Sequence, residues 1–130
     1  MPYGFSIWDD EQRLLLWNRT YLEIYGLPGD RFTRRMPLSE VCEITVAAGN
    51  HPGTSAAELL AEYRRRLARA AATPTPITFE KRIRGRTVKT TYTPTPGLGT
   101  VVTHEDITER TLRERDLETQ NIRFDAALNS

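Results

Sequence analysis

The sequence predicts one α+β domain, in which helices cover one face of an antiparallel sheet and a further helix leaves at the C-terminus. Three observations support this prediction. Segments that suit strands occupy residues 4–17 and 77–106. Between them, apolar residues recur at helical spacing, interrupted by Gly and Pro. From Thr108 onward the chain is charged, rich in helix formers and free of Gly and Pro. Helices between antiparallel strands give a layered α+β architecture.

A β-hairpin is expected first. Residues 4–8 alternate apolar and small side chains, residues 9–12 are a polar turn, and residues 13–17 are largely apolar. A short helix follows, because Asn18 is a preferred N-cap residue and aromatic residues recur behind it at helical spacing. Gly26 suits the left-handed conformation that ends many helices.

Two further helices are expected after a loop at residues 27–37. From Leu38 to Ala48, apolar residues keep an i, i+3, i+4, i+7 rhythm. Ser55 and Glu58 have the spacing of a capping box, which predicts where the next helix starts. The apolar face of that helix is expected to include Leu59 or Leu60, Tyr63, Leu67 and Ala70.

Three strands are expected after the Pro-rich break at residues 73–76, since a residue before proline avoids the α region. They are residues 77–83, a strand around residues 88–92, and residues 99–106, which are rich in β-branched side chains. The last strand runs directly into the C-terminal helix. Together with the two strands of the hairpin, these three strands give a predicted sheet of five strands.

The composition argues against several classes of function. The chain has 18 Lys and Arg against 17 Asp and Glu, a net charge of +1, and so lacks the basic excess typical of nucleic-acid surfaces. The one cationic run, residues 64–66, is interpreted as a solvated helix face, with Glu62 and Arg66 on the outer side. The single cysteine, Cys42, forms no internal disulfide and fits a reducing compartment. No apolar run reaches the ~20 residues of a membrane span.

Two motifs at opposite ends of the domain resemble those of PAS sensor domains. The segment Asp106-Ile107-Thr108-Glu109-Arg110 is similar to the Asp-Ile-Thr signature that ends PAS domains and opens their signalling helix. Residues 18–26 resemble the PAS segment after the second strand. The resemblance covers about residues 3–110. It implies a five-stranded antiparallel sheet with helices on one face, a sensory domain at residues 1–108, and a signalling helix or linker at residues 109–130.

The resemblance also implies a function, that of a non-catalytic sensory and dimerisation module in a bacterial signal-transduction protein, for example a two-component system in the cytoplasm. In PAS proteins, ligands lie between the inner face of the sheet and the helices. The candidates for such a pocket are Trp8, Tyr21, Tyr25, Val41, Tyr63, Tyr92 and Val102. For each of these residues, ordinary core packing is the alternative.

Signal transmission is expected at residues 106–110. A ligand or partner would shift the sheet, and this segment would pass the shift to the exit helix and to an output domain downstream. By analogy that domain is a histidine kinase or a diguanylate cyclase. Asp106 or Thr108 is expected to cap the helix. Glu109 and Arg110 are expected to form switchable salt bridges at the junction.

The exit helix carries a possible seam with 4-3-4 spacing, formed by Leu117, Asn121, Phe124 and Leu128. This pattern favours a homodimer through a parallel coiled coil, and the alternative is a helix that packs on its own sheet. Residues 123–129 resemble the start of a second PAS domain. We therefore expect a longer parent protein.

No metal site is expected. His51 is assigned to a solvated loop, and His104 to a hydrogen-bonded or exposed position on the last strand, without further ligands at suitable spacing. Haem is disfavoured because the family usually ligates it from a helix. Flavin adduct chemistry is disfavoured because Cys42 lies in Glu-Val-Cys-Glu-Ile rather than in an Asn-Cys-Arg motif. The cofactor stays unidentified, and the domain could have none.

Two other functions are compatible with the sequence. One is an interaction module without a ligand, which a solid core would favour over a well-formed cavity. The other is a small isomerase-like α+β enzyme, which would need a buried acid near an aromatic hydroxyl, for example Asp106 with Tyr92. The polar exit helix and the Asp-Ile-Thr junction argue against the enzyme.

Overall fold

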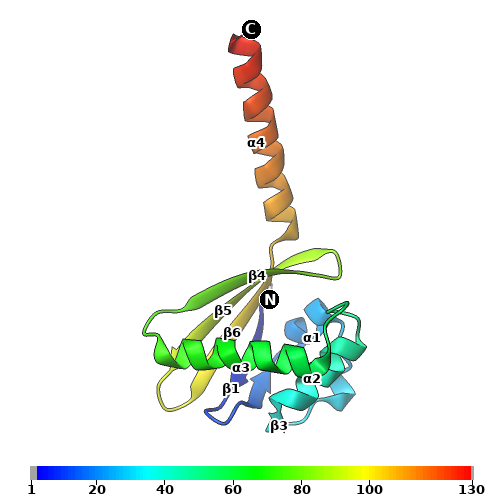
Figure 1. The fold of residues 1–130 in the computed structure, drawn as a ribbon, viewed down its shortest axis with the longest axis vertical. Coiled ribbons are helices and arrows are strands. Elements are labelled where there is room, and N and C mark those ends of the chain that lie inside the picture. The colour runs from blue at the N-terminus through cyan, green and yellow to red at the C-terminus, as the bar shows by residue number, and fades with distance from the viewer. Residues whose placement is uncertain (1–2, 130) are drawn as a thin grey trace.

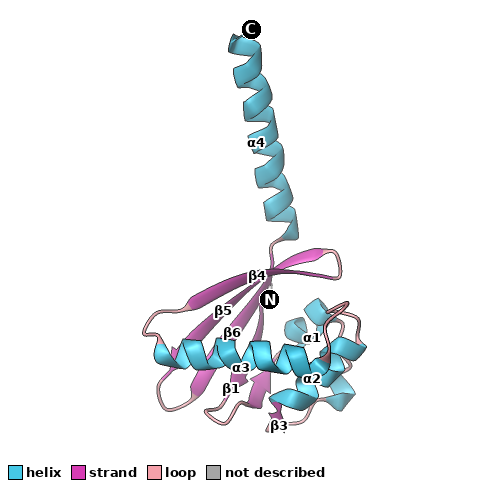
Figure 2. Ribbon diagram, viewed as in Figure 1, coloured by secondary structure: helices cyan, strands magenta, loops and turns pink. Residues whose placement is uncertain are grey.

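The computed structural model describes residues 3–129, with side chains described through Arg123. The chain forms an α+β domain from which a long C-terminal helix projects (Figure 1). Strands come first, helices follow, and strands return before the final helix (Figure 2). The α+β class predicted from the sequence is confirmed.

Six strands form one antiparallel sheet in the order β3-β2-β1-β6-β5-β4. They are β1 (Tyr3–Trp8), β2 (Arg13–Trp17), β3 (Met36–Pro37), β4 (Ile77–Ile83), β5 (Arg86–Thr95) and β6 (Gly99–Asp106). The sheet has one strand more than the five expected. The additional strand, β3, lies in the segment assigned to a loop and pairs with Arg13 and Leu14 at the sheet edge. Two residues are too short to show a strand periodicity, so sequence patterning misses it.

The first and last strands of the domain are neighbours in the sheet. β1 pairs antiparallel with β6, so that Ser6 lies opposite Val102 and Gly4 opposite His104. A Cβ atom on Gly4 would lie 2.8 Å from the Cα of Tyr21, which shows how closely the following helix packs on β1. The centre of the sheet therefore brings residues from both ends of the domain to one face.

Three α-helices and a short 3-10 turn cover that face (Figure 1). They are α1 (Arg19–Tyr25), the turn η1 (Gly29–Arg31), α2 (Leu38–Ala47) and α3 (Ala56–Ala72). Asn18 caps α1 by accepting a hydrogen bond from the Tyr21 N–H at 3.0 Å, and Gly26 ends it at φ +62°. Ser55 and Glu58 form the predicted capping box of α3.

The core lies between this helical layer and the sheet. Its fully buried apolar side chains include Leu14, Ile44, Leu59 and Val88. On α3 it is Leu59 rather than Leu60 that is buried. Lys81 lies on the same, less exposed side of β4 as Phe79 and Ile83. Its ammonium reaches Glu62 of α3 at 3.5 Å. Its position near the edge of the sheet lets the ammonium remain partly hydrated.

The final helix, α4 (Thr108–Asn129), stands away from the sheet and helices (Figure 1). Its described side chains from Arg113 to Arg123 are all exposed. Among the described residues, no helix combines the length and the apolar character that a membrane crossing requires.

Candidate functional site

A cavity of about 50 Å³ lies between the inner face of the sheet and the helices. The structure places all seven predicted pocket residues around it, namely Trp8, Tyr21, Tyr25, Val41, Tyr63, Tyr92 and Val102. Sequence reasoning missed seven further lining residues, which are Ser6, Leu38, Thr45, Arg66, Leu67, Thr90 and His104. The missed residues include the cavity's only charged side chain and its only imidazole among the described residues.

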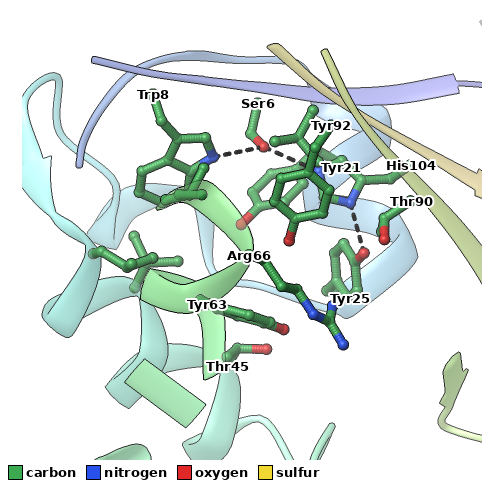
Figure 3. Close-up of a pocket in the computed structure, with 14 residues that line it drawn as sticks. Ser6, Trp8, Tyr21, Tyr25, Thr45, Tyr63, Arg66, Thr90, Tyr92 and His104 are labelled. Atoms are coloured by element: carbon green, nitrogen blue, oxygen red, sulfur yellow. Dashed lines mark hydrogen bonds between the residues drawn. The ribbon is translucent and has the colours of Figure 1, made fainter. Parts of the chain in front are cut away.

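A chain of hydrogen bonds runs along one wall of the cavity (Figure 3). The Trp8 indole N–H donates to Ser6 Oγ at 3.0 Å. Ser6 Oγ lies 3.0 Å from Nε2 of His104, and the Tyr25 hydroxyl lies 2.6 Å from Nδ1 of the same ring. His104 thus connects β1 with α1 from its position on β6.

The His104 imidazole is neutral at ordinary pH. Burial lowers its pKa from 6.5 to about 3. A neutral ring donates from one nitrogen and accepts at the other. If Nδ1–H donates to Tyr25, the Tyr25 O–H is free to donate into the cavity; if Nε2–H donates to Ser6, the Ser6 O–H is free instead. Either tautomer leaves one hydroxyl proton for a guest.

Both nitrogens of His104 are occupied in this arrangement, so neither is free to ligate haem iron. Cys42 is buried on α2 and does not line the cavity. Burial raises its pKa to about 12, which suppresses the thiolate. The site therefore fits neither haem ligation nor cysteine adduct chemistry.

Four tyrosines surround His104 and the space beside it. Tyr21 packs against Tyr25 with ring centroids 5.3 Å apart, and both rings contact His104 at 4.8 and 5.2 Å. Burial raises the pKa of Tyr21, Tyr25, Tyr63 and Tyr92, so all four hydroxyls stay protonated. These groups and His104 are far from the neutral pKa that proton transfer favours, which suits them to hydrogen bonding rather than acid–base work.

Arg66 points inward, which contradicts its assignment to a solvated face. Its side chain is only 14% exposed, and its guanidinium carbon lies 4.3 Å from the centroid of Phe79 and 5.5 Å from that of Tyr63. An Nη atom of Arg66 forms an ion pair with Oε1 of Glu62 at 2.8 Å. The position is seven residues after Leu59 on α3, so Arg66 belongs to the buried stripe. Arg64 and Arg65 do face solvent.

At the end of β6, Asp106 and Thr108 form a compact junction with β5. Thr108 donates to Asp106 Oδ1 through its N–H at 3.0 Å and its hydroxyl at 2.6 Å. Asp106 Oδ2 accepts from Arg86 at 2.9 Å, and Thr108 Oγ1 accepts the Thr87 N–H at 2.8 Å. Burial opposes the charge of Asp106, but these hydrogen bonds outweigh it and lower the pKa of the carboxyl.

The rest of the junction segment lies against the same hairpin. Ile107 is buried, and its N–H donates to the Thr87 carbonyl at 2.9 Å. Arg110 pairs with Glu105 at 3.4 Å. Glu109 adds to the stronger effect of Asp106 in raising the pKa of Arg86. All five residues of the predicted transmission segment thus lie at or beside the point where β5, β6 and α4 meet.

The proposed seam of α4 is only partly described. Leu117 and Asn121 are exposed, whereas the side chains of Phe124 and Leu128 lie outside the described residues. The exposed apolar residues Leu112, Leu117 and Ile122 follow one another at five-residue steps, or about 140° around the helix. They are therefore distributed around α4 rather than gathered on one face.

His51 is buried, so its assignment to a solvated loop was wrong. Its ring stacks edge-on against Tyr63 with centroids 6.3 Å apart. The described residues contain no cluster of three side chains that could hold a metal ion. Asp106 does not line the cavity, so the structure does not bring it together with Tyr92 as the isomerase alternative requires.

Comparisons with known proteins agree with this architecture. The sequence profile of the PAS fold matches residues 1–115. The PAS domain of Bordetella pertussis BvgS superposes with a TM-score of 0.60 at 25% identity, covering 93% of this chain and 88% of that one.

Two further solved structures share the fold. A domain of an HTR-like protein from Haloarcula marismortui has a TM-score of 0.56 at 20% identity, over 83% of this chain and 100% of that one. A PAS domain from Colwellia psychrerythraea has a TM-score of 0.56 at 14% identity, over 84% and 89%. No curated protein matches the chain. Since the PAS profile spans most of its length, the chain belongs to the PAS family, whose members typically serve in sensing and signalling.

Proposed function

We propose that this chain is a non-catalytic sensory and dimerisation module of a cytoplasmic bacterial signalling protein. A ligand or partner changes the hydrogen bonds of the cavity, β6 carries the change to the junction at Asp106 and Thr108, and α4 passes it to an output domain. A histidine kinase of a two-component system or a diguanylate cyclase would serve as that domain.

One observation carries this proposal. His104 and Asp106 lie two residues apart on β6, and alternate residues of a strand share a face. His104 holds the cavity wall through Ser6 and Tyr25, and Asp106 holds the start of α4 through Thr108. A displacement of β6 at one residue therefore acts on the other across a single rigid strand.

Backbone amide NMR tests this coupling. Tyr25→Phe removes the hydroxyl bonded to His104, and we expect it to shift the amide resonances from His104 to Thr111. Tyr63→Phe is the matched control, because it removes a hydroxyl from the same cavity that is not bonded to His104. If Tyr25→Phe leaves Thr108 and Thr111 unmoved, or if both variants shift them equally, the proposed route is wrong.

The proposal includes a second copy of the chain paired along α4. This helix projects from the domain and exposes Leu117 and Asn121 of the proposed seam, side chains that a partner helix would cover. Sedimentation is expected to show a dimer for the chain and a monomer for Leu117→Glu. Leu98→Glu is the control, since Leu98 is also exposed but lies at the opposite end of β6. A monomeric parent chain would remove dimerisation from the proposal.

A ligand-free interaction module is the second candidate, and the small volume of the cavity favours it. Native mass spectrometry separates the two. Extra mass that disappears on denaturation identifies a bound molecule and supports the sensor, whereas a dimer without extra mass supports the interaction module.

A further inference from the structure

We infer that the cavity binds a small monocarboxylate of about the size of acetate, with Arg66 as its cationic partner. This inference rests on the proposed sensory function, since it names the class of ligand that the cavity would sense. Four features of the described residues support it: the charge balance around Arg66, the two contacts of its guanidinium, the hydroxyl groups of the wall, and the cavity volume.

The charge balance leaves a cation in excess beside the cavity. Arg66 and Lys81 share the carboxylate of Glu62, at 2.8 and 3.5 Å, so two positive charges face one negative charge. His51, which lies near the same cluster, does not add a charge, because burial and the nearby Lys81 lower its pKa to about 4. Among the described lining residues, Arg66 is the only charged one. The net positive charge of this partly buried cluster favours an anionic guest.

The guanidinium of Arg66 has two fixed contacts. Its carbon lies over the ring of Phe79 at 4.3 Å, and one Nη atom donates a hydrogen bond to Glu62 at 2.8 Å. Burial opposes its charge, but Tyr92 and Glu62 outweigh burial and raise its pKa. Because the planar guanidinium is already fixed, its remaining N–H groups can bind a carboxylate with little further loss of side-chain conformational entropy.

The wall of the cavity supplies neutral hydroxyl groups that can donate hydrogen bonds. Tyr21 and Tyr63 also line the cavity, and each carries a hydroxyl group. Both stay protonated, because burial raises their pKa. The chain of hydrogen bonds through His104 leaves one further O–H, on Tyr25 or Ser6. Carboxylate oxygens accept several hydrogen bonds at once and suit such a set of donors.

The volume limits the size of the ligand. A cavity of about 50 Å³ is larger than one water needs but far smaller than the ~150 Å³ that accommodates benzene. A carboxylate with a methyl group or a similarly short chain matches this space. Acetate has only a few non-hydrogen atoms, so its dissociation constant is expected to be no lower than about tens of micromolar.

The test is a calorimetric and NMR titration of the 130-residue chain with sodium acetate, at ionic strength balanced with sodium chloride. Acetamide, the neutral isostere of acetate, is titrated in parallel. We expect saturable binding of acetate and at least tenfold weaker binding of acetamide. Arg66→Gln should weaken acetate binding at least tenfold, whereas Arg65→Gln, the same change at the exposed neighbouring position, should leave it within twofold.

Several results would overturn the inference: no saturable response to acetate, equal binding of acetamide, or unchanged binding in Arg66→Gln. If Arg66→Gln does not fold, the comparison of acetate with acetamide on the unmodified chain decides the question. The two proposals fail separately. Acetate that binds without moving the amides of Thr108 and Thr111 contradicts the route to α4, whereas a Tyr25→Phe shift at α4 without acetate binding contradicts only the ligand class.

Discussion

Acid is expected to destabilise this domain through one buried side chain, His104. In the folded chain, burial lowers the pKa of His104 to about 3, against an ordinary value of 6.5. Between these two values the unfolded chain binds a proton that the folded chain does not. The contribution to the free energy of unfolding is therefore complete above about pH 6.5 and is lost as the pH falls toward 3.

The magnitude follows from the two pKa values. At 1.36 kcal/mol per unit, the interval from 6.5 to about 3 corresponds to about 5 kcal/mol over the whole range. Between pH 7 and pH 5 the loss is about 2 kcal/mol. That is a large share of the roughly 5–15 kcal/mol that stabilises a typical domain.

Urea unfolding at pH 7 and pH 5 measures this effect, with His104→Gln as the comparison. A glutamine amide donates and accepts hydrogen bonds but does not titrate. We expect the parent chain to lose about 2 kcal/mol more than the variant between the two pH values. His51, whose pKa is also lowered, is present in both chains and cancels. An identical pH dependence in the two chains would refute the assignment of His104 as a neutral, buried group.

Three further substitutions test how the site is supported. Asn18→Ala is expected to cost about 2 kcal/mol in urea unfolding, because its side chain makes three hydrogen bonds to the backbone of β1 and α1; a loss below about 0.5 kcal/mol would contradict this. Ser55→Ala should cost about 1 kcal/mol through the lost capping box, and no change in melting temperature would count against that cap. Gly99→Ala should destabilise more than Gly97→Ala, because both have positive φ but only Gly99 would place a Cβ against the carbonyl of Trp8; equal thermal shifts would show that the close approach is unimportant.

The elements with local signals could be predicted from the sequence. Asn18 and Gly26 mark the ends of α1, and Ser55 marks the start of α3, because caps depend on residues only a few positions apart. The strand β3 could not be predicted, since its two residues are defined by pairing with β2 rather than by a pattern of their own. Lys81 was ambiguous because its inward position depends on reaching Glu62 of α3.

The aromatic residues that line the cavity were predicted from the sequence, whereas most of its polar residues were missed. Large apolar side chains that recur on one face of a strand or helix indicate a core. Whether a serine or histidine is buried depends instead on the hydrogen-bond partners that the fold brings to it. Ser6 and His104 are 98 residues apart in the chain and meet only because β1 pairs with β6. For Arg66 a local signal did exist, since its spacing from Leu59 and Tyr63 places it on the buried stripe of α3.

A double-mutant cycle between the cavity and the junction tests the central claim most directly. Tyr25→Phe and Thr108→Ala are combined, and the free energy of unfolding is measured for the parent, both single variants and the double variant. If β6 couples the two sites, the effects should depart from additivity by at least about 0.5 kcal/mol, whereas the control cycle of Tyr63→Phe with Thr108→Ala should be additive. Additive effects in both cycles would contradict the proposed communication between the cavity and α4.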